Sequence, residues 1–172
     1  TIGRSVDELG EIFEQLDGHP RLGLCIDSCH WWVSGIDVTD PETFLVTPDT
    51  VKAALTPKTK AVIAVHLFGN VADVRAIAAL GVPVIEDAAQ AAGSTGPDGR
   101  PGALGTLATF SFYPSKNLGA FGDGGAITTD DRELDERVRT LRFHGSHDKV
   151  DYSEIGYNSR LDELQAAILR VQ

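Results

Sequence analysis

Asp87 and Lys116 are the two residues whose types and positions best suit chemistry. Asp87 follows the apolar run 82–85, and Lys116 follows the apolar segment 107–112. In open α/β sheets, ligands bind beyond the carboxyl ends of the strands. A carboxylate placed there could pair with a protonated ring nitrogen, a guanidinium or a metal, or it could cap a helix beginning at Ala88. A lysine in a crevice can attack a carbonyl to form a Schiff base. The alternative for Lys116 is a surface lysine at the end of a strand.

Serine hydroxyls lie close to this lysine. Ser111 lies five residues before Lys116, and Ser115 is adjacent to Lys116. Hydroxyls and loop amides near a lysine suit a phosphate group, although an ordinary serine in a strand fits the same pattern. The chain contains no G-x-x-x-x-G-K-[ST] motif, and no G-x-G-x-x-G follows its first strand. The sequence therefore predicts neither a nucleotide P-loop nor a dinucleotide site.

Alternating strands and helices must position these side chains. The apolar spacing and turn residues predict strands at 61–65, 82–85, 107–112 and 126–129. Helices are predicted at 48–55, at 71–80, from a cap at Asp130 to 141, and from a cap at Ser159 to the end of the chain. A glycine-rich loop spans 93–105. This alternation predicts an α/β fold, with a mainly parallel sheet and helices on both faces.

Composition excludes several other classes of protein. The 172 residues are 42% hydrophobic and 23% charged, which is typical of a folded globular protein. No apolar run is long enough to span a bilayer, and no signal peptide is visible, so we expect a cytoplasmic protein without a membrane partner. A net charge of −10 makes a nucleic-acid partner unlikely. Two cysteines, Cys25 and Cys29, cannot form a disulfide scaffold.

Residues 40–172 resemble the DegT/StrS family of pyridoxal-phosphate sugar aminotransferases. The resemblance is carried, in family order, by the segments 56–69 (TPKTKAVIAVHLFG), 86–91 (EDAAQA), 111–119 (SFYPSKNLG), 122–126 (GDGGA) and 156–167 (GYNSRLDELQAA). It implies the central part of a fold-type I aminotransferase large domain. The family's glycine-rich phosphate loop, its ring-stacking aromatic and its C-terminal domain do not appear in the chain. His66 lies in one family motif, and we expect a satisfied core histidine there.

The resemblance also implies the chemistry and the site. An amino group would pass from an amino acid such as glutamate to a nucleotide-linked keto-sugar. Lys116 would hold pyridoxal 5'-phosphate as a Schiff base and move the proton between substrate and cofactor, while Asp87 would keep the pyridine nitrogen protonated. Gln90 would lie beside the cofactor ring and Ser111 would bind the phosphate. Asn158 would contact the phosphate bound to the other subunit of a homodimer.

Residues 1–37 resemble a different family, endonuclease IV, a zinc-dependent apurinic endonuclease with a TIM-barrel fold. Asp27 and His30 match two of its metal ligands. Two ligands cannot build a zinc site, so a helix–strand fragment of TIM-barrel type without metal is the favoured interpretation. We therefore divide the chain into an endonuclease IV-like fragment, 1–39, and a partial aminotransferase domain, 40–172. The first alternative to an active aminotransferase is an inactive fusion or truncated remnant. A zinc-dependent apurinic endonuclease is a second alternative, with less support than the first.

Overall fold

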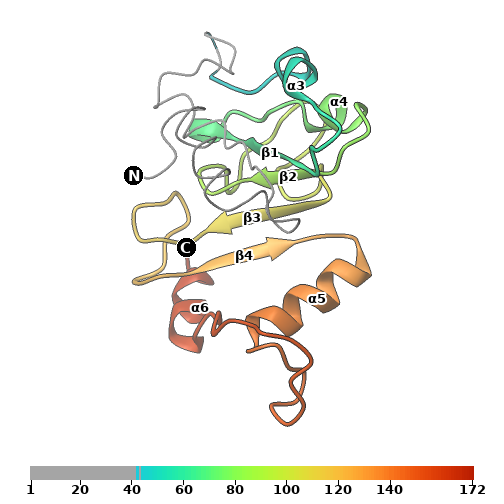
Figure 1. Ribbon diagram of the computed structural model, residues 1–172. Coiled ribbons are helices and arrows are strands. Elements are labelled where there is room, and N and C mark those ends of the chain that lie inside the picture. Colours follow the sequence, from blue (N-terminus) through green and yellow to red (C-terminus); the bar gives the residue numbers. More distant parts are fainter. Residues whose placement is uncertain (1–41, 43) are drawn as a thin grey trace, which may run out of the picture.

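A four-stranded sheet forms the centre of the structure. The computed structural model describes residue 42 and residues 44–172. The strands β1 (Val62–Val65), β2 (Val84–Asp87), β3 (Leu107–Ser111) and β4 (Gly125–Thr128) lie in the order β1-β2-β3-β4 (Figure 1). The first three are parallel and β4 is antiparallel to β3. The predicted α/β class and mainly parallel sheet are confirmed. The helix and strand predicted before residue 37 lie outside the described residues.

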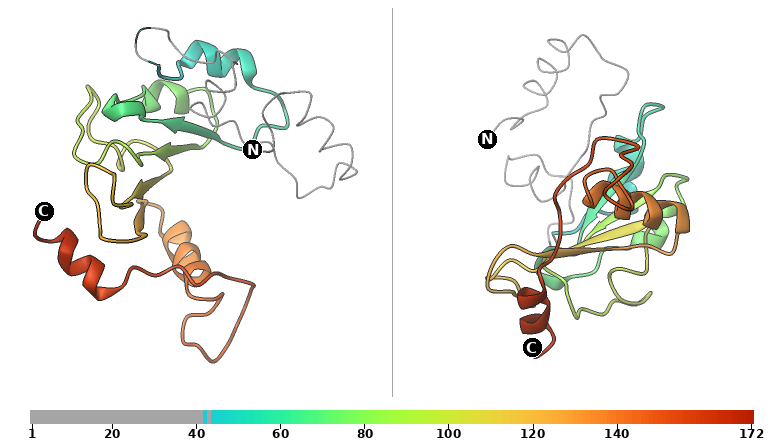
Figure 2. Two further views of the ribbon diagram at one scale, coloured as in Figure 1. Left: turned by 90° about the vertical axis from the view of Figure 1, so that its left-hand side faces the viewer. Right: turned by 90° about the horizontal axis from the view of Figure 1, so that it is seen from below.

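The helices lie in two groups, one near β1 and β2 and the other beyond β4 (Figure 1). α3 (Pro48–Ala54) packs against α4 (Val74–Ala78), which in turn packs against β2. α5 (Arg132–Arg142) and α6 (Glu163–Leu169) lie beyond β4, at the opposite end of the sheet (Figures 1 and 2). A short 3₁₀ turn, η1 (Leu67–Gly69), follows β1. The prediction of helices covering both faces stays a prediction.

Side-chain caps decide where the helices begin. Thr47 and Thr50 form a capping box at the start of α3, where the sequence predicted that a helix begins. The predicted cap at Asp130 is wrong by one residue, because the carboxylate of Asp131 accepts the backbone N–H groups that open α5. The predicted cap at Ser159 is also wrong. Its backbone N–H donates to Arg142 at the end of α5, and Asp162 caps α6 instead.

Two other predicted boundaries shift for similar reasons. The helix predicted at 71–80 begins later, because Asp73 caps α4 by accepting a hydrogen bond from the N–H of Ala76. The strand predicted at 82–85 extends to Asp87, because parallel pairing with β1 runs from Val84 to Asp87. This extension places Asp87 inside the sheet ladder, at its carboxyl end.

The two faces of the sheet have different contents. Successive side chains of a strand point to opposite faces. The face we call the core face carries Ala64, Val84, Glu86 and Ala108, and it packs against Ile77 of α4. The opposite face, which we call the site face, carries Asp87, Thr109 and Ser111, all of them half-buried. The hydrophobic core and the polar strand ends are therefore on opposite sides of one sheet.

None of the helices in the described part of the chain is long and apolar enough to cross a membrane.

Candidate active site

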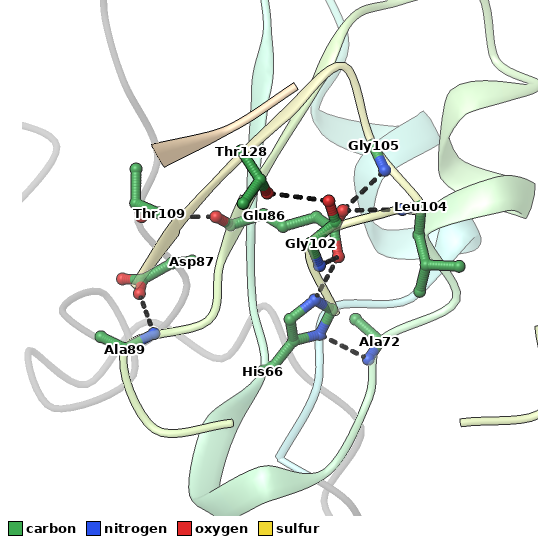
Figure 3. A network of polar contacts seen from close by, with 10 residues as sticks. All are labelled: His66, Ala72, Glu86, Asp87, Ala89, Gly102, Leu104, Gly105, Thr109 and Thr128. Carbon is green, nitrogen blue, oxygen red and sulfur yellow. Dashed lines mark hydrogen bonds and ion pairs between the residues drawn. The ribbon is translucent and has the colours of Figure 1, made fainter. Parts of the chain in front are cut away.

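Asp87 lies at the carboxyl end of β2 with one oxygen of its carboxylate engaged. Its Oδ1 accepts a hydrogen bond of 3.0 Å from the N–H of Ala89, which closes a tight turn (Figure 3). Within residues 44–172, Oδ2 makes no hydrogen bond or ion pair. The segment after Asp87 is turn, so the alternative that Asp87 caps a helix is wrong. The geometry leaves an acceptor oxygen directed away from the backbone, which suits a cationic N–H partner.

Ser111 lies on the site face, close in register to Asp87. Asp87 is paired with Thr109 of β3, and Ser111 follows Thr109 by one strand period. Its hydroxyl accepts a weak hydrogen bond, 3.3 Å long, from the N–H of Tyr113. Among the residues that the structure describes, the hydroxyl proton has no acceptor, so it can bind one such as a phosphate oxygen.

Lys116 lies in the loop that leaves β3. The loop folds back through a hydrogen bond of 2.9 Å from the N–H of Lys116 to the carbonyl of Tyr113. The amide of Asn117 donates to the carbonyl of Ala92, which connects this loop to the segment after Asp87. Lys116 is half-buried, and in the described part of the chain its ammonium group makes no hydrogen bond or ion pair. The loop thus brings an uncommitted amine to the same edge of the sheet.

Gln90 also belongs to this edge. It is half-buried, and its Oε1 accepts a hydrogen bond of 3.0 Å from the N–H of Phe68 in η1. Phe68 has a positive φ of 54° and is 75% exposed. The side chain of Gln90 therefore holds η1, the turn after β1, against the turn that follows Asp87.

Asn158 is in a different place. It pairs with Phe143, the residue that directly follows α5, and its Oδ1 accepts a hydrogen bond of 3.1 Å from Nε of Arg160. α5 lies on the far side of β4 from β2 (Figure 1). The structure thus gathers Asp87, Gln90, Ser111 and the Lys116 loop at one edge, and it leaves Asn158 apart from them.

The two weak metal candidates, Asp27 and His30, lie outside the described residues. In the part of the chain that the structure describes, no group of three or more His, Cys, Asp or Glu side chains could hold a metal ion.

Glu86, which the sequence analysis did not single out, is the centre of a buried polar network. Its side chain is fully buried and accepts four hydrogen bonds (Figure 3). Oε1 accepts from the N–H groups of Leu104 (2.9 Å) and Gly105 (2.7 Å), and Oε2 accepts from Gly102 (3.0 Å) and from His66 (2.9 Å). Burial acts to raise the pKa of Glu86, but the hydrogen bonds outweigh it and hold that pKa below its ordinary value.

His66 is the second member of this network, and it is fully buried. Its Nδ1 accepts a hydrogen bond of 3.1 Å from the N–H of Ala72, so the ring proton is on Nε2 and points to Glu86. The expectation of a satisfied core histidine is confirmed. The sequence signal for its partner was a glutamate directly after the apolar residues Val84 and Ile85, at a position that alternation places on the same face as Val84.

The glycine-rich loop 93–105 must approach the sheet closely to reach Glu86. A Cβ atom added at Gly105 would lie 2.7 Å from the carbonyl oxygen of Val84, and one at Gly102 would lie 2.9 Å from the ring of Phe110. Gly102 also has a positive φ of 99°. Glycine at these two positions therefore lets the loop cover the buried carboxylate.

Proteins of known sequence and structure resemble this chain along most of its length. It is 57% identical over 137 residues to "Pleiotropic regulatory protein" of Geobacillus stearothermophilus, covering 77% of the chain and 37% of the relative. It is 51% identical over 129 residues to "dTDP-3-amino-3,4,6-trideoxy-alpha-D-glucose transaminase" of Streptomyces venezuelae, covering 73% and 34%. The chain therefore spans about a third of the length of these curated relatives.

Two solved structures are similar in fold. DesV of S. venezuelae, solved in complex with a ketimine intermediate, matches with a TM-score of 0.78 and 40% identity, covering 96% of this chain and 48% of that chain. The Bacillus subtilis protein ntda, solved with bound cofactor PMP, matches with a TM-score of 0.67 and 36% identity, covering 76% and 31%.

The fold of the described residues is similar to that of solved aminotransferase structures. The sequence model of the DegT/DnrJ/EryC1/StrS aminotransferase family matches residues 33–172, and the chain belongs to this family. The family resemblance predicted from the motifs is confirmed. The match begins before the boundary predicted between residues 39 and 40, while the endonuclease IV resemblance of residues 1–37 is not shown.

Proposed function

We propose that this chain is part of a pyridoxal-phosphate-dependent aminotransferase. It would transfer an amino group from an amino acid such as glutamate to a nucleotide-linked keto-sugar. The observation that carries the proposal is the arrangement at the carboxyl edge of the sheet. Asp87 presents an open carboxylate oxygen there, Ser111 lies on the same face, and Lys116 follows on the adjoining loop.

The donor set at this edge fits pyridoxal phosphate. A protonated pyridine nitrogen needs an acceptor that bears negative charge, and Oδ2 of Asp87 is one. A phosphate needs hydroxyl and amide donors, and the hydroxyl of Ser111 is one. An aldehyde needs an amine without another partner, and among residues 44–172 the ammonium group of Lys116 has none. Gln90, held against η1, lies at the same edge and would contact the ring.

Each of these residues has a defined task in the proposed reaction. When bound, pyridoxal phosphate supplies an electron sink for the carbanion at the Cα of the amino donor. Asp87 would keep the ring nitrogen protonated through a charge-assisted hydrogen bond from that N–H. Lys116 would hold the cofactor through its amine; once the donor's amine has replaced it there, the freed amine of Lys116 would move the proton between the donor Cα and the C4′ carbon. Ser111 would hold the phosphate and so keep the ring in register with Lys116.

A homodimer would complete the site. Asn158 lies beside the end of α5, on the other side of β4 from Asp87, so it is not placed to serve the site of its own chain. In a two-fold assembly the same amide could reach the phosphate bound by the partner subunit. The nucleotide-sugar substrate is supported by the name of the Streptomyces venezuelae relative, a transaminase of a dTDP-linked amino sugar. We propose a cytoplasmic location on the same basis.

An inactive remnant is the second candidate, and one observation favours it. Large apolar side chains are exposed outside the proposed site, among them Ile155 (96%), Val171 (85%) and Phe121 (79%). Without a covering partner such side chains promote association in water. A sharp near-UV circular dichroism spectrum of the purified chain would count against a poorly packed remnant. The division at residues 39 and 40 remains a proposal, and reading the genomic DNA across codons 36 to 45 would test it.

Titration of the chain with pyridoxal phosphate tests the proposed function. Binding at Lys116 predicts a new absorbance band in the visible or near-ultraviolet range, and glutamate or another amino donor should shift it. The matched variants are Lys116→Ala, which should abolish the band, and Lys58→Ala, an exposed lysine whose loss should leave it unchanged. A band that persists in Lys116→Ala would contradict the assignment.

A further inference from the structure

His66 holds the dipeptide Glu86-Asp87 at two points. Its backbone N–H donates to the carbonyl oxygen of Asp87 over 3.0 Å, and its ring Nε2 donates to the carboxylate of Glu86 over 2.9 Å. The first bond extends the β1–β2 ladder by one residue. The second comes from the core face of the sheet. His66, the residue that follows β1, therefore fixes both the backbone of Asp87 and the side chain of the neighbouring Glu86.

Glu86 connects these two hydrogen bonds of His66 to the glycine-rich loop and to β3. Its carboxylate accepts the N–H groups of Gly102, Leu104 and Gly105, and its backbone carbonyl accepts the hydroxyl of Thr109 over 3.3 Å. Figure 3 shows these contacts meeting at Glu86, directly beside Asp87. The end of β1, the glycine-rich loop and β3 are all joined through a single side chain and its backbone.

A buried carboxylate is an energetically unfavourable residue for a core position. Burying a charge costs free energy unless hydrogen bonds compensate for it, and apolar residues of similar size often give equal or greater stability. Glu86 is fully buried and has two donors on each oxygen, so its position and orientation are closely defined. An apolar side chain would fill the space without fixing the direction of the strand end.

Asp87 depends on this arrangement because its own contacts are few. Adjacent strand residues point to opposite faces, so a rotation of the backbone at Glu86 turns the carboxylate of Asp87 as well. Among the described residues, the side chain of Asp87 is held by one hydrogen bond, from the N–H of Ala89. The direction of its open oxygen thus follows from how the Glu86-Asp87 backbone is held.

We propose that His66 and Glu86 are positioning residues that fix the carboxylate of Asp87 from the opposite face of the sheet. This inference rests on the proposed function only in the identity of what Asp87 then binds. Glu86 and His66 do not touch the site face. They act by holding the backbone on which Asp87 is carried.

Amide hydrogen exchange on the full chain without added cofactor tests the positioning directly. The substitution Glu86→Gln replaces one carboxylate oxygen by an NH₂ group. This group cannot accept the two hydrogen bonds that the oxygen accepted. We expect exchange to accelerate at least about tenfold at the amides that faced the replaced oxygen, either Gly102 or the pair Leu104 and Gly105, as for loss of hydrogen bonds to a charged group. Positioning further predicts faster exchange at Ala89, whose N–H reports the orientation of Asp87.

Two controls separate this effect from general loosening of the fold. Gly96, in the same loop, donates to Gly99 and not to Glu86, so its exchange should stay unchanged. Glu136→Gln removes the charge of an exposed glutamate on α5 and should alter none of these amides. If Glu86→Gln accelerates exchange at any of these loop amides and leaves Ala89 unchanged, Glu86 anchors the loop only and the proposal is wrong.

A variant pair at His66 keeps the test decisive if Glu86→Gln fails to fold. His66→Gln retains one donor and one acceptor, whereas His66→Leu retains neither. Positioning predicts faster exchange at Ala89 in His66→Leu and a return toward the wild-type rate in His66→Gln. Equal rates at Ala89 in the wild type and both variants would overturn it.

The absorbance spectrum of added pyridoxal phosphate then separates the two hypotheses. We expect Glu86→Gln to shift the bound spectrum in the same direction as Asp87→Asn, because both disturb the partner of the ring nitrogen. If the wild-type chain binds no cofactor, or Asp87→Asn leaves its spectrum unchanged, the proposed function fails and exchange at Ala89 still decides the positioning. If Asp87→Asn changes the spectrum and Glu86→Gln does not, the positioning fails and the function stands.

Discussion

Asp87 and Thr109 face each other across two parallel strands, and this pairing sets the geometry of the candidate site. It places Ser111 on the same face as Asp87 and starts the Lys116 loop at the same edge. Ligands of open α/β sheets bind at this kind of edge because side chains of several strands converge there.

Replacement of Asp87 should affect activity far more than stability. Asp87→Asn keeps the shape and the hydrogen bond from Ala89 but removes the charge that would hold a ring nitrogen protonated. In a complete enzyme carrying this domain, we expect transamination to fall at least about 100-fold, the scale for losing one preorganised electrostatic partner. Steady-state transamination assays measure it. Asp130→Asn, an exposed carboxylate, is the control, and equal effects of both variants would contradict the role.

Glu86 should make the fold sensitive to acid. Its pKa is lower in the folded chain than its ordinary value of 4.5, so its ionised form stabilises the fold at pH values above that. This contribution should disappear as the pH falls below about 4.5 and through the folded-state pKa. Urea unfolding at a series of pH values measures it. Glu86→Gln should flatten the acid limb of the profile, and a variant with the same acid limb as the wild type would refute this origin.

At neutral pH, Glu86→Gln should also lower the free energy of unfolding. The substitution leaves a backbone donor, such as that of Gly102, buried without its acceptor. Leaving such a group unsatisfied costs about 1–3 kcal/mol. The urea midpoint gives the change, with Glu136→Gln as an exposed control expected to stay within about 0.5 kcal/mol of the wild type.

Gly105 should tolerate no side chain. A Cβ atom there would lie 2.7 Å from the carbonyl oxygen of Val84 and 3.1 Å from Cγ of Glu86. Gly105→Ala must push the loop away from the sheet, and we expect a loss of about 1–3 kcal/mol, as for overpacked sites. Gly122→Ala is the matched control, because its nearest neighbour would be 3.6 Å away. Thermal unfolding of the two variants compares them, and similar midpoints would show that the loop is not tightly packed.

Much of this arrangement could be predicted from local sequence. The proline after Thr47 and the apolar run at 61–65 predicted α3 and β1 almost to the residue, because capping and burial are local effects. The cap at Asp130 was wrong for a local reason, because another aspartate stood one residue away. The cap at Ser159 was wrong because its backbone N–H donates to the carbonyl of Arg142, a contact with α5 that local sequence does not show.

The Glu86–His66 network could not be predicted in the same way. Its members are 20 residues apart in sequence, and three of its donors are backbone N–H groups of a loop that reaches Glu86 only after the sheet has formed. The sequence showed a glutamate in an apolar strand and a glycine-rich loop after it. Pairing of β1 with β2 turns these separate features into one buried site.

Borohydride reduction of the chain with pyridoxal phosphate tests the central claim most directly. Reduction makes the bond between cofactor and lysine permanent, so peptide mapping by mass spectrometry identifies the residue. We predict one modified peptide, containing Lys116, with exposed lysines such as Lys58 unmodified at equimolar cofactor. Modification spread over the surface lysines, or none at Lys116, would contradict the account.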